Sequence, residues 1–202
     1  MTRSHCIMLL AAAALPLGAC QKSEVANQAD INLVDANNAQ TNTTATHPSD
    51  PIESAMVAAP AAIASEATIA AAQPDGTMKV LREGKNGWTC MPDNPNTPGA
   101  DPMCMDANAL KWAEAWMGHK DPPADNVGFM YMLAGGSDAS NMDPFGTKPA
   151  EGHKWVETGP HVMVVGAPSL NALYPSGPQP DTTRPYVMFA NTPYAHVMVP
   201  VR

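Results

Sequence analysis

Histidine and methionine recur with the same spacing in short apolar segments near the C-terminus. The segments read Pro160-His-Val-Met-Val164, Pro185-Tyr-Val-Met-Phe189 and Ala195-His-Val-Met-Val199. Residues two apart in a strand point to the same face, so we expect His161 beside Met163. The same spacing places His196 beside Met198. Imidazole nitrogen and thioether sulfur suit copper, so these four residues are candidate ligands of a soft metal. The alternative is that the methionines fill a core beneath a helix, with the two histidines bonded to protein groups.

A second group of reactive side chains lies in the segment 135–141, directly after a long apolar run. Ser137 and Asp138 supply a hydroxyl and a carboxylate there, and His161 or His196 would complete a Ser/His/Asp constellation for hydrolysis. The chain contains no G-x-S-x-G pattern, and Gly, Ser, Asp and Asn are also the usual residues of turns. Turn, ligand-binding and catalytic roles therefore all stay open for this loop.

Two cysteines remain once those of the N-terminal leader are set aside, namely Cys90 and Cys104. In an oxidising compartment we expect them to form a disulfide. The bond would close a loop of about 15 residues and stabilise the fold by about 3 kcal/mol in the chain-entropy model. A pair of metal-binding thiolates is the alternative.

The leader contains the most specific motif of the chain. A short basic start is followed by the apolar run 7–15, which is too short to span a bilayer permanently but suits a signal peptide. The next residues, Leu17-Gly18-Ala19-Cys20, resemble a bacterial lipobox. The resemblance implies cleavage before Cys20, acylation of that cysteine and anchoring in a membrane. Gln21, in place of an aspartate, implies the outer membrane, with the protein facing the periplasm.

Composition divides the rest of the chain into a tether and one domain. Every aromatic residue lies at or beyond Trp88, and the segment 21–60 contains none. Such a segment cannot bury enough apolar surface to order itself. We therefore expect a signal peptide at 1–19, the lipidated cysteine with a disordered tether at 20–60, and a single globular periplasmic domain at 61–202.

The elements that position the candidate residues predict an α+β fold. With 21 prolines and 14 glycines the domain must be rich in loops. We expect one main helix at 107–117, capped by Asp106 and ended by Gly118, packed on a small antiparallel sheet of four to six strands. The expected strands are 78–83, 88–91, 127–133, 161–165, 186–190 and 195–199. The first two would form a hairpin, and the alanine-rich segment 61–72 would be a short helix.

Charge and motifs together limit the function. The net charge is −8, from 11 basic and 19 acidic residues, which argues against a nucleic-acid partner. The motifs G-W-T-C-x-P, P-M-C-x-D, G-G-S-D-A-S-N and T-P-Y-A-H resemble a family of hypothetical exported bacterial proteins. That resemblance implies one domain and no catalytic residue. We expect a lipid-anchored domain that binds a small ligand or an envelope partner without catalysis and without a cofactor. Copper binding and hydrolysis are the alternatives.

Overall fold

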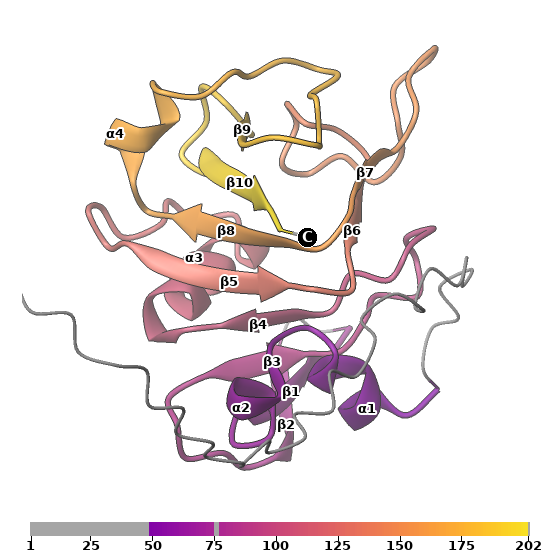
Figure 1. Cartoon of the computed structure of the whole chain (residues 1–202), viewed down its shortest axis with the longest axis vertical. Helices are drawn as coiled ribbons and strands as arrows, with labels where there is room; N and C mark the ends of the chain where they lie inside the picture. The colour runs from indigo at the N-terminus through magenta and orange to yellow at the C-terminus, as the bar shows by residue number, and fades with distance from the viewer. Residues whose placement is uncertain (1–48, 75–76, 202) are drawn as a thin grey trace, which may run out of the picture. The chain divides into compact units, whose positions relative to one another are not determined.

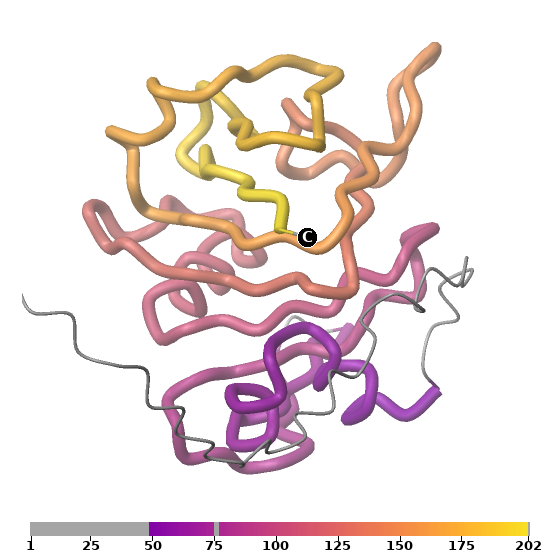
Figure 2. Tube along the Cα trace, viewed as in Figure 1, coloured from indigo at the N-terminus to yellow at the C-terminus, as the bar shows by residue number. Residues whose placement is uncertain are grey.

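The computed structural model describes residues 49–74 and 77–201. The predicted signal peptide, Cys20 and most of the predicted tether lie outside these residues. The helices are α1 (Pro51–Met56), α2 (Ala61–Ala64), α3 (Ala107–Met117) and α4 (Pro168–Asn171). The strands are β1 (Thr68–Ala72), β2 (Met78–Arg82), β3 (Thr89–Met91), β4 (Met103–Met105), β5 (Gly128–Met132), β6 (Gly136–Asp138), β7 (Val156–Thr158), β8 (His161–Val165), β9 (Tyr186–Met188) and β10 (His196–Pro200). Figures 1 and 2 show their path in space.

The main sheet has eight strands in the order β2-β1-β3-β4-β5-β8-β10-β9, and β6 pairs with β7 in a second, two-stranded sheet. β1 and β3 are parallel, and the other neighbours in the main sheet are antiparallel. The predicted α+β class with one main helix is confirmed. The prediction of four to six antiparallel strands is wrong, because β1 and β4 also join the sheet and β1 adds a parallel pair.

The start of the domain differs from the prediction in its pairing. The two segments expected to form a hairpin are both strands, β2 and β3, but β1 lies between them and pairs with each. The alanine-rich segment is helical only in α2, and its second half is β1. Alanine favours helices by well under 1 kcal/mol per residue over most residue types, and strand pairing on both sides of β1 outweighs that preference.

The folded part of the chain begins earlier than the predicted boundary at residue 61. α1 lies within the segment predicted as tether, and the carboxylate of Asp50 accepts hydrogen bonds from two backbone N–H groups of its first turn at 2.7 and 3.0 Å. Ala55 and Ala58 are completely buried. The domain therefore includes α1 and reaches back at least to Asp50.

α3 begins and ends where the sequence predicts, and two features attach it to β5. One carboxylate oxygen of Asp106 accepts hydrogen bonds from Asn108 N at 3.0 Å and Ala109 N at 2.8 Å, and the other accepts one from Phe129 N at 3.0 Å. Gly128 allows the close approach, because a Cβ at that position would lie 2.3 Å from Ala109 N. The start of α3 is thereby fixed against the centre of the sheet.

The two faces of the sheet differ in composition and in what covers them. On the methionine face, Met105, Met130, Met163 and Met198 align across β4, β5, β8 and β10, and α3 packs over them. The other face bears the predicted disulfide, which joins directly opposite residues of β3 and β4 and is covered by α1 and α2. The sheet thus lies between α3 on one side and α1 with α2 on the other (Figure 1).

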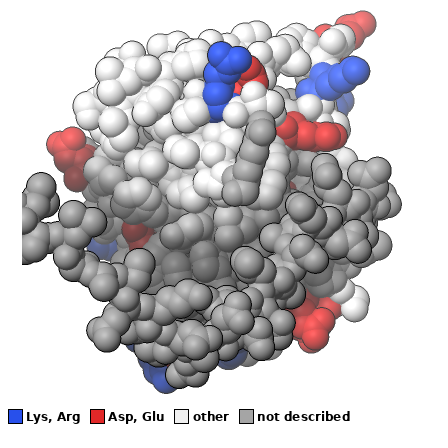
Figure 3. Space-filling view, viewed as in Figure 1, with Lys and Arg blue, Asp and Glu red and all other residues white. Residues whose placement is uncertain are grey.

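Charged side chains are dispersed over the described surface. The described ion pairs, Lys85–Glu66 at 2.8 Å and Arg184–Asp181 at 2.7 Å, are between exposed side chains. In Figure 3 the charged side chains form small groups, with blue and red in places side by side, on an otherwise largely uncharged described surface. No helix within the described ranges is long and apolar enough to cross a bilayer. The carboxylates whose pKa values are raised by burial, Asp101 and Asp138, are not part of these exposed ion pairs.

Candidate functional site

A cavity of about 1050 Å³ opens on the methionine face. Its floor consists of methionines from four strands, namely Met130, Met132, Met163, Met188 and Met198. α3 contributes Trp112 and Trp116 to its lining, and β6 with the loop that follows it contributes another part. Residues 92–97 and Asp101, within the loop that the disulfide closes, also line it. The volume is comparable with that of known ligand sites, about 300–1,000 Å³.

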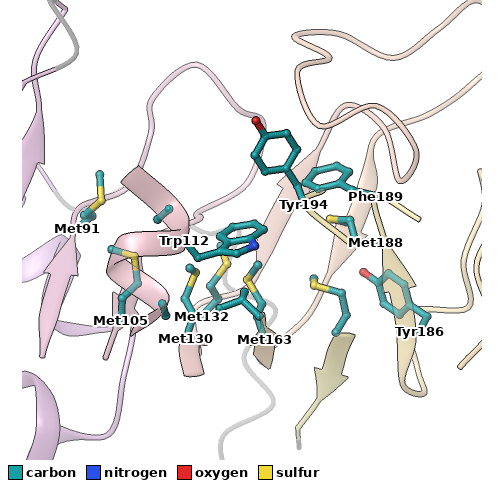
Figure 4. Packing of buried hydrophobic residues seen from close by; sticks show 14 of the residues in the cluster. Met91, Met105, Trp112, Met130, Met132, Met163, Tyr186, Met188, Phe189 and Tyr194 are labelled. Atoms are coloured by element: carbon teal, nitrogen blue, oxygen red, sulfur yellow. The ribbon is translucent and has the colours of Figure 1, made fainter. Parts of the chain in front are cut away.

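The methionines also pack against the helix, as the core interpretation predicts. All five floor methionines belong to the same core cluster as Trp112, and Trp116 packs at its edge. Figure 4 shows the indole of Trp112 above Met130, Met132 and Met163, with Phe189 near Met188. The same side chains also line an open volume, so this side of the sheet is both part of the core and the lining of a cavity.

His161 and His196 are held in the same way. Each Nδ1 lies against the carbonyl oxygen two residues earlier, Gly159 O at 2.8 Å and Tyr194 O at 2.9 Å. A carbonyl only accepts, so Nδ1 is the protonated nitrogen and Nε2 presents a lone pair. Neither Nε2 has a partner among the described residues, although the side chains are only 1 % and 0 % exposed. A buried acceptor without a donor is costly, and because His196 borders the cavity its Nε2 is a candidate ligand contact.

The environment of His196 keeps its ring neutral. Its ring centroid lies 5.1 Å from that of Trp112 and 5.4 Å from that of Phe189, and it borders the cavity. Burial lowers the pKa of His196 to about 4, and burial also lowers the pKa of His161. Both imidazoles are therefore uncharged at pH 7, as an acceptor of hydrogen bonds or a metal ligand must be.

The register of the sheet separates the two histidines. His161 is opposite Met132 on β5 and Pro200 on β10, whereas His196 is opposite Met188 on β9. Pro200 lies four residues beyond His196, which is about 13 Å at 3.3 Å per residue. The backbone positions of the two histidines are therefore offset along the strands, yet the charge of His161 still contributes to the lowered pKa of His196. The candidate ligands Met163 and Met198 are opposite one another between them.

Two carboxylates that interact through their charges, those of Asp101 and Asp138, line the cavity. Asp101 is satisfied, because it accepts hydrogen bonds from Asn94 N at 2.8 Å and Thr97 Oγ1 at 2.7 Å. Asp138, the last residue of β6, accepts none from the described residues. Burial raises the pKa of Asp138 to about 7, with a further contribution from the charge of Asp101, and burial raises the pKa of Asp101 to about 6. Asp138 is thus a half-buried acid on the cavity lining, without a counter-ion in the part of the chain described.

The candidate serines are not paired with a histidine. Ser140 Oγ accepts hydrogen bonds from Met142 N and Asp143 N, both at 3.0 Å, which is the capping of a turn. Ser137 borders the cavity and packs closely against Gly99. Both histidine Nδ1 atoms are bonded to carbonyls and both Nε2 atoms have no described partner. The structure therefore does not bring together the nucleophile and base that hydrolysis requires.

The loop that contains these residues is fixed to its surroundings. Asn141 Nδ2 donates hydrogen bonds to Gly177 O at 2.7 Å and Val187 O at 3.0 Å. Trp116 Nε1 donates one to Pro144 O at 2.8 Å, which joins the loop to α3. The G-G-S-D-A-S-N segment thus combines structural residues with Ser137 and Asp138, which face the cavity.

Asp101 and the cavity itself are not predicted by the sequence analysis. Asp101 lies in the proline-rich loop closed by the disulfide, and the only sequence signal was that the disulfide ties this loop to the sheet. Within the described residues, no group of three or more His, Cys, Asp or Glu side chains could hold a metal ion, so a metal site here would depend on methionine sulfur. Comparison of the chain with protein-family models, curated proteins and solved structures finds no match.

Proposed function

We propose that this chain is a lipid-anchored envelope protein whose domain binds a small apolar molecule on the methionine face. The cavity above the methionine floor is the observation that supports this most strongly. Methionine and tryptophan side chains form its floor and the α3 wall, and polar side chains, among them Asp101, Ser137 and Asp138, line the rest. A combination of apolar lining and polar groups that orient the ligand is typical of ligand sites. The free Nε2 of His196 favours a ligand that brings a hydrogen-bond donor.

The experiment is a titration with N-phenyl-1-naphthylamine, an apolar aromatic probe with one N–H donor. The full chain with Cys20→Ser is used, so that no acyl chain competes for the probe. We expect saturable binding of one probe per chain. Trp116→Ala, which removes part of the cavity wall, should weaken binding about tenfold. Trp88→Ala is the matched control, since Trp88 is also half-buried but packs on the opposite face. Absence of saturable binding would contradict the proposal.

The anchoring part of the proposal depends on the lipobox-like segment before Cys20. The Cys90–Cys104 disulfide supports an oxidising compartment, because disulfides persist outside the cytosol. Replacing Cys20 with serine should release the protein from membranes or block its processing. If wild type and variant mature and fractionate identically, the protein is not a lipoprotein.

A soft metal ion is a second candidate, favoured by the two histidines. Each has Nδ1 fixed by a carbonyl, as is usual for metal-binding histidines, and each faces a methionine across the sheet. Because each histidine is opposite a different methionine in the sheet register, this candidate predicts separate sites at His161 with Met132 and at His196 with Met188. Calorimetric titration with Cu(I) or Ag(I) tests it. Metal binding is supported if the affinity is sub-micromolar and if His161→Ala or His196→Ala lowers the number of ions bound per chain by one. Weak binding that neither substitution changes would refute it.

A further inference from the structure

We propose that the ligand of this cavity is an organic cation, a protonated amine on an apolar body, with its nitrogen at Asp138 and its body over the methionine floor. The inference rests on the proposed function, because it names the class of molecule that the same cavity would bind. Three features of the described residues lead to it: the charge of the lining, the state of Asp138, and the aromatic wall with His196.

The lining of the cavity is charged with one sign only. Among the described residues that border it are Asp93, Asp101, Asp138 and Asp143, and none is lysine or arginine. An anionic ligand would enter an apolar site facing several carboxylates, where repulsion is screened less than in water. The field of the lining therefore favours a positive ligand and disfavours a negative one.

Asp138 is the carboxylate that lacks a partner. Asp101 beside it has two hydrogen-bond donors, from Asn94 and Thr97, whereas Asp138 has none from the described residues and forms no described ion pair. A neutral ligand would leave an ionised Asp138 unpaired. An ammonium group supplies both the counter-charge and the donor, and hydrogen bonds between charged groups are the strongest of their kind.

The rest of the cavity fits the body of such a molecule. Trp112 and Trp116 stack at a centroid distance of 6.1 Å, and Trp116 lies 6.4 Å from Phe189, so aromatic faces flank the methionine floor. Aromatic faces attract cations, and thioethers pack well on apolar groups. His196 adds a neutral acceptor at the cavity lining, which is completely buried and has no partner among the described residues. This observation is independent of the acidic residues and also calls for a donor on the ligand.

The test compares three compounds that share one apolar body. They are 1-naphthylmethylamine, 1-naphthylmethanol and 1-naphthylacetate, which are cationic, neutral and anionic at pH 8. Binding to the full chain with Cys20→Ser is measured by calorimetry. We expect the amine to bind about tenfold or more tightly than the alcohol, as for one hydrogen bond between charged groups, and the acetate to bind most weakly. This order tests the inference without any change in the cavity.

The variant Asp138→Asn locates the effect. It should bring the affinities of the amine and the alcohol within about twofold of each other, while the alcohol binds as before. Glu157→Gln is the matched control, since Glu157 is an exposed carboxylate on β7, next to β6, and does not border the cavity. It should leave the preference for the amine intact.

The outcomes separate the inference from the proposed function. If the alcohol binds and the amine binds no better, or if the preference for the amine survives Asp138→Asn, the cation inference is wrong and the binding function stands. If neither the three compounds nor the N-phenyl-1-naphthylamine probe binds, the proposed function is wrong as well.

Discussion

Replacing Asp138 with asparagine should raise the free energy of unfolding at pH 8. The carboxylate is desolvated on the cavity wall, has no partner among the described residues, and has a pKa raised by burial from 3.8 to about 7. At pH 8 the folded chain must hold this group ionised in an unfavourable place, and the unfolded chain holds it ionised in water. The amide has nearly the same shape and carries no charge, so the substitution removes that penalty.

The magnitude follows from the change in pKa. Each pKa unit corresponds to about 1.4 kcal/mol, so a rise from 3.8 to about 7 amounts to about 4 kcal/mol at pH 8. The amide also lacks a described partner in this place, which offsets part of the gain. We therefore expect a stabilisation of about 2–4 kcal/mol.

The sign fixes the pH window. Between pH 4 and pH 7 the folded chain binds one more proton at Asp138 than the unfolded chain, so this group lowers stability as the pH rises through that window. Below pH 4 both states are protonated, and wild type and variant should converge. His161 and His196 act in the opposite direction, since their lowered pKa values reduce stability as the pH falls below about 6.5. The difference between variant and wild type removes these shared contributions.

Two other titratable groups near Asp138 affect the comparison of variant and wild type. Tyr186 has its pKa raised to about 12 by burial and stays protonated throughout. The charge of Asp101 raises the pKa of Asp138, so part of the expected stabilisation by Asp138→Asn comes from removing that repulsion. The assay is urea unfolding followed by tryptophan fluorescence at pH 4.5 and pH 8, with the disulfide intact. Glu157→Gln serves as the control and should change stability by less than about 0.5 kcal/mol. A variant no more stable than wild type at pH 8, or equally stabilised at both pH values, would refute the reasoning.

Three further results are expected. Binding of 1-naphthylmethylamine should weaken about tenfold from pH 8 to pH 6 as Asp138 takes up its proton, with the alcohol unaffected; calorimetry at both pH values measures this, and equal amine affinities would contradict it. Gly128→Ala should destabilise the domain by about 3 kcal/mol or more, because its Cβ would meet the backbone of α3, whereas Gly159→Ala, with open space around it, should cost less than about 1 kcal/mol in the same urea assay. Replacing Cys90 and Cys104 with alanine should lower the free energy of unfolding by about 3 kcal/mol, and an unchanged urea midpoint would show that the disulfide does not stabilise the fold.

The sequence predicts best where local signals and burial agree. The capping aspartate, the apolar stripe and the closing glycine define α3 to the residue. The alternation in the His-Val-Met segments correctly places methionine and histidine on one face, because a strand with one buried face allows a single alternation. β8 matches its predicted bounds, and β5 lies at the centre of the sheet as expected.

Long-range pairing is what the sequence does not provide. The turn at 84–87 favours a hairpin, yet β1 from an earlier segment inserts between β2 and β3. Alternation likewise places His161 and His196 on one face without giving their register, and the register offsets their backbone positions by about 13 Å along the strand. The cavity lining combines Asp138 with Asp101, which are distant in sequence and meet only once the disulfide-closed loop and β6 have both folded over the sheet.

The methionine floor has a consequence for selectivity. A floor of leucine or isoleucine would present a surface of nearly fixed shape, because branched side chains have few rotamers. Unbranched methionine side chains can change rotamer and so pack against ligands of different shapes. A site of this kind discriminates poorly by shape and must discriminate by other means, which here are the carboxylates of the lining. The protein should therefore accept a series of amines with differently shaped bodies at similar affinity, and reject members of that series once the nitrogen loses its charge.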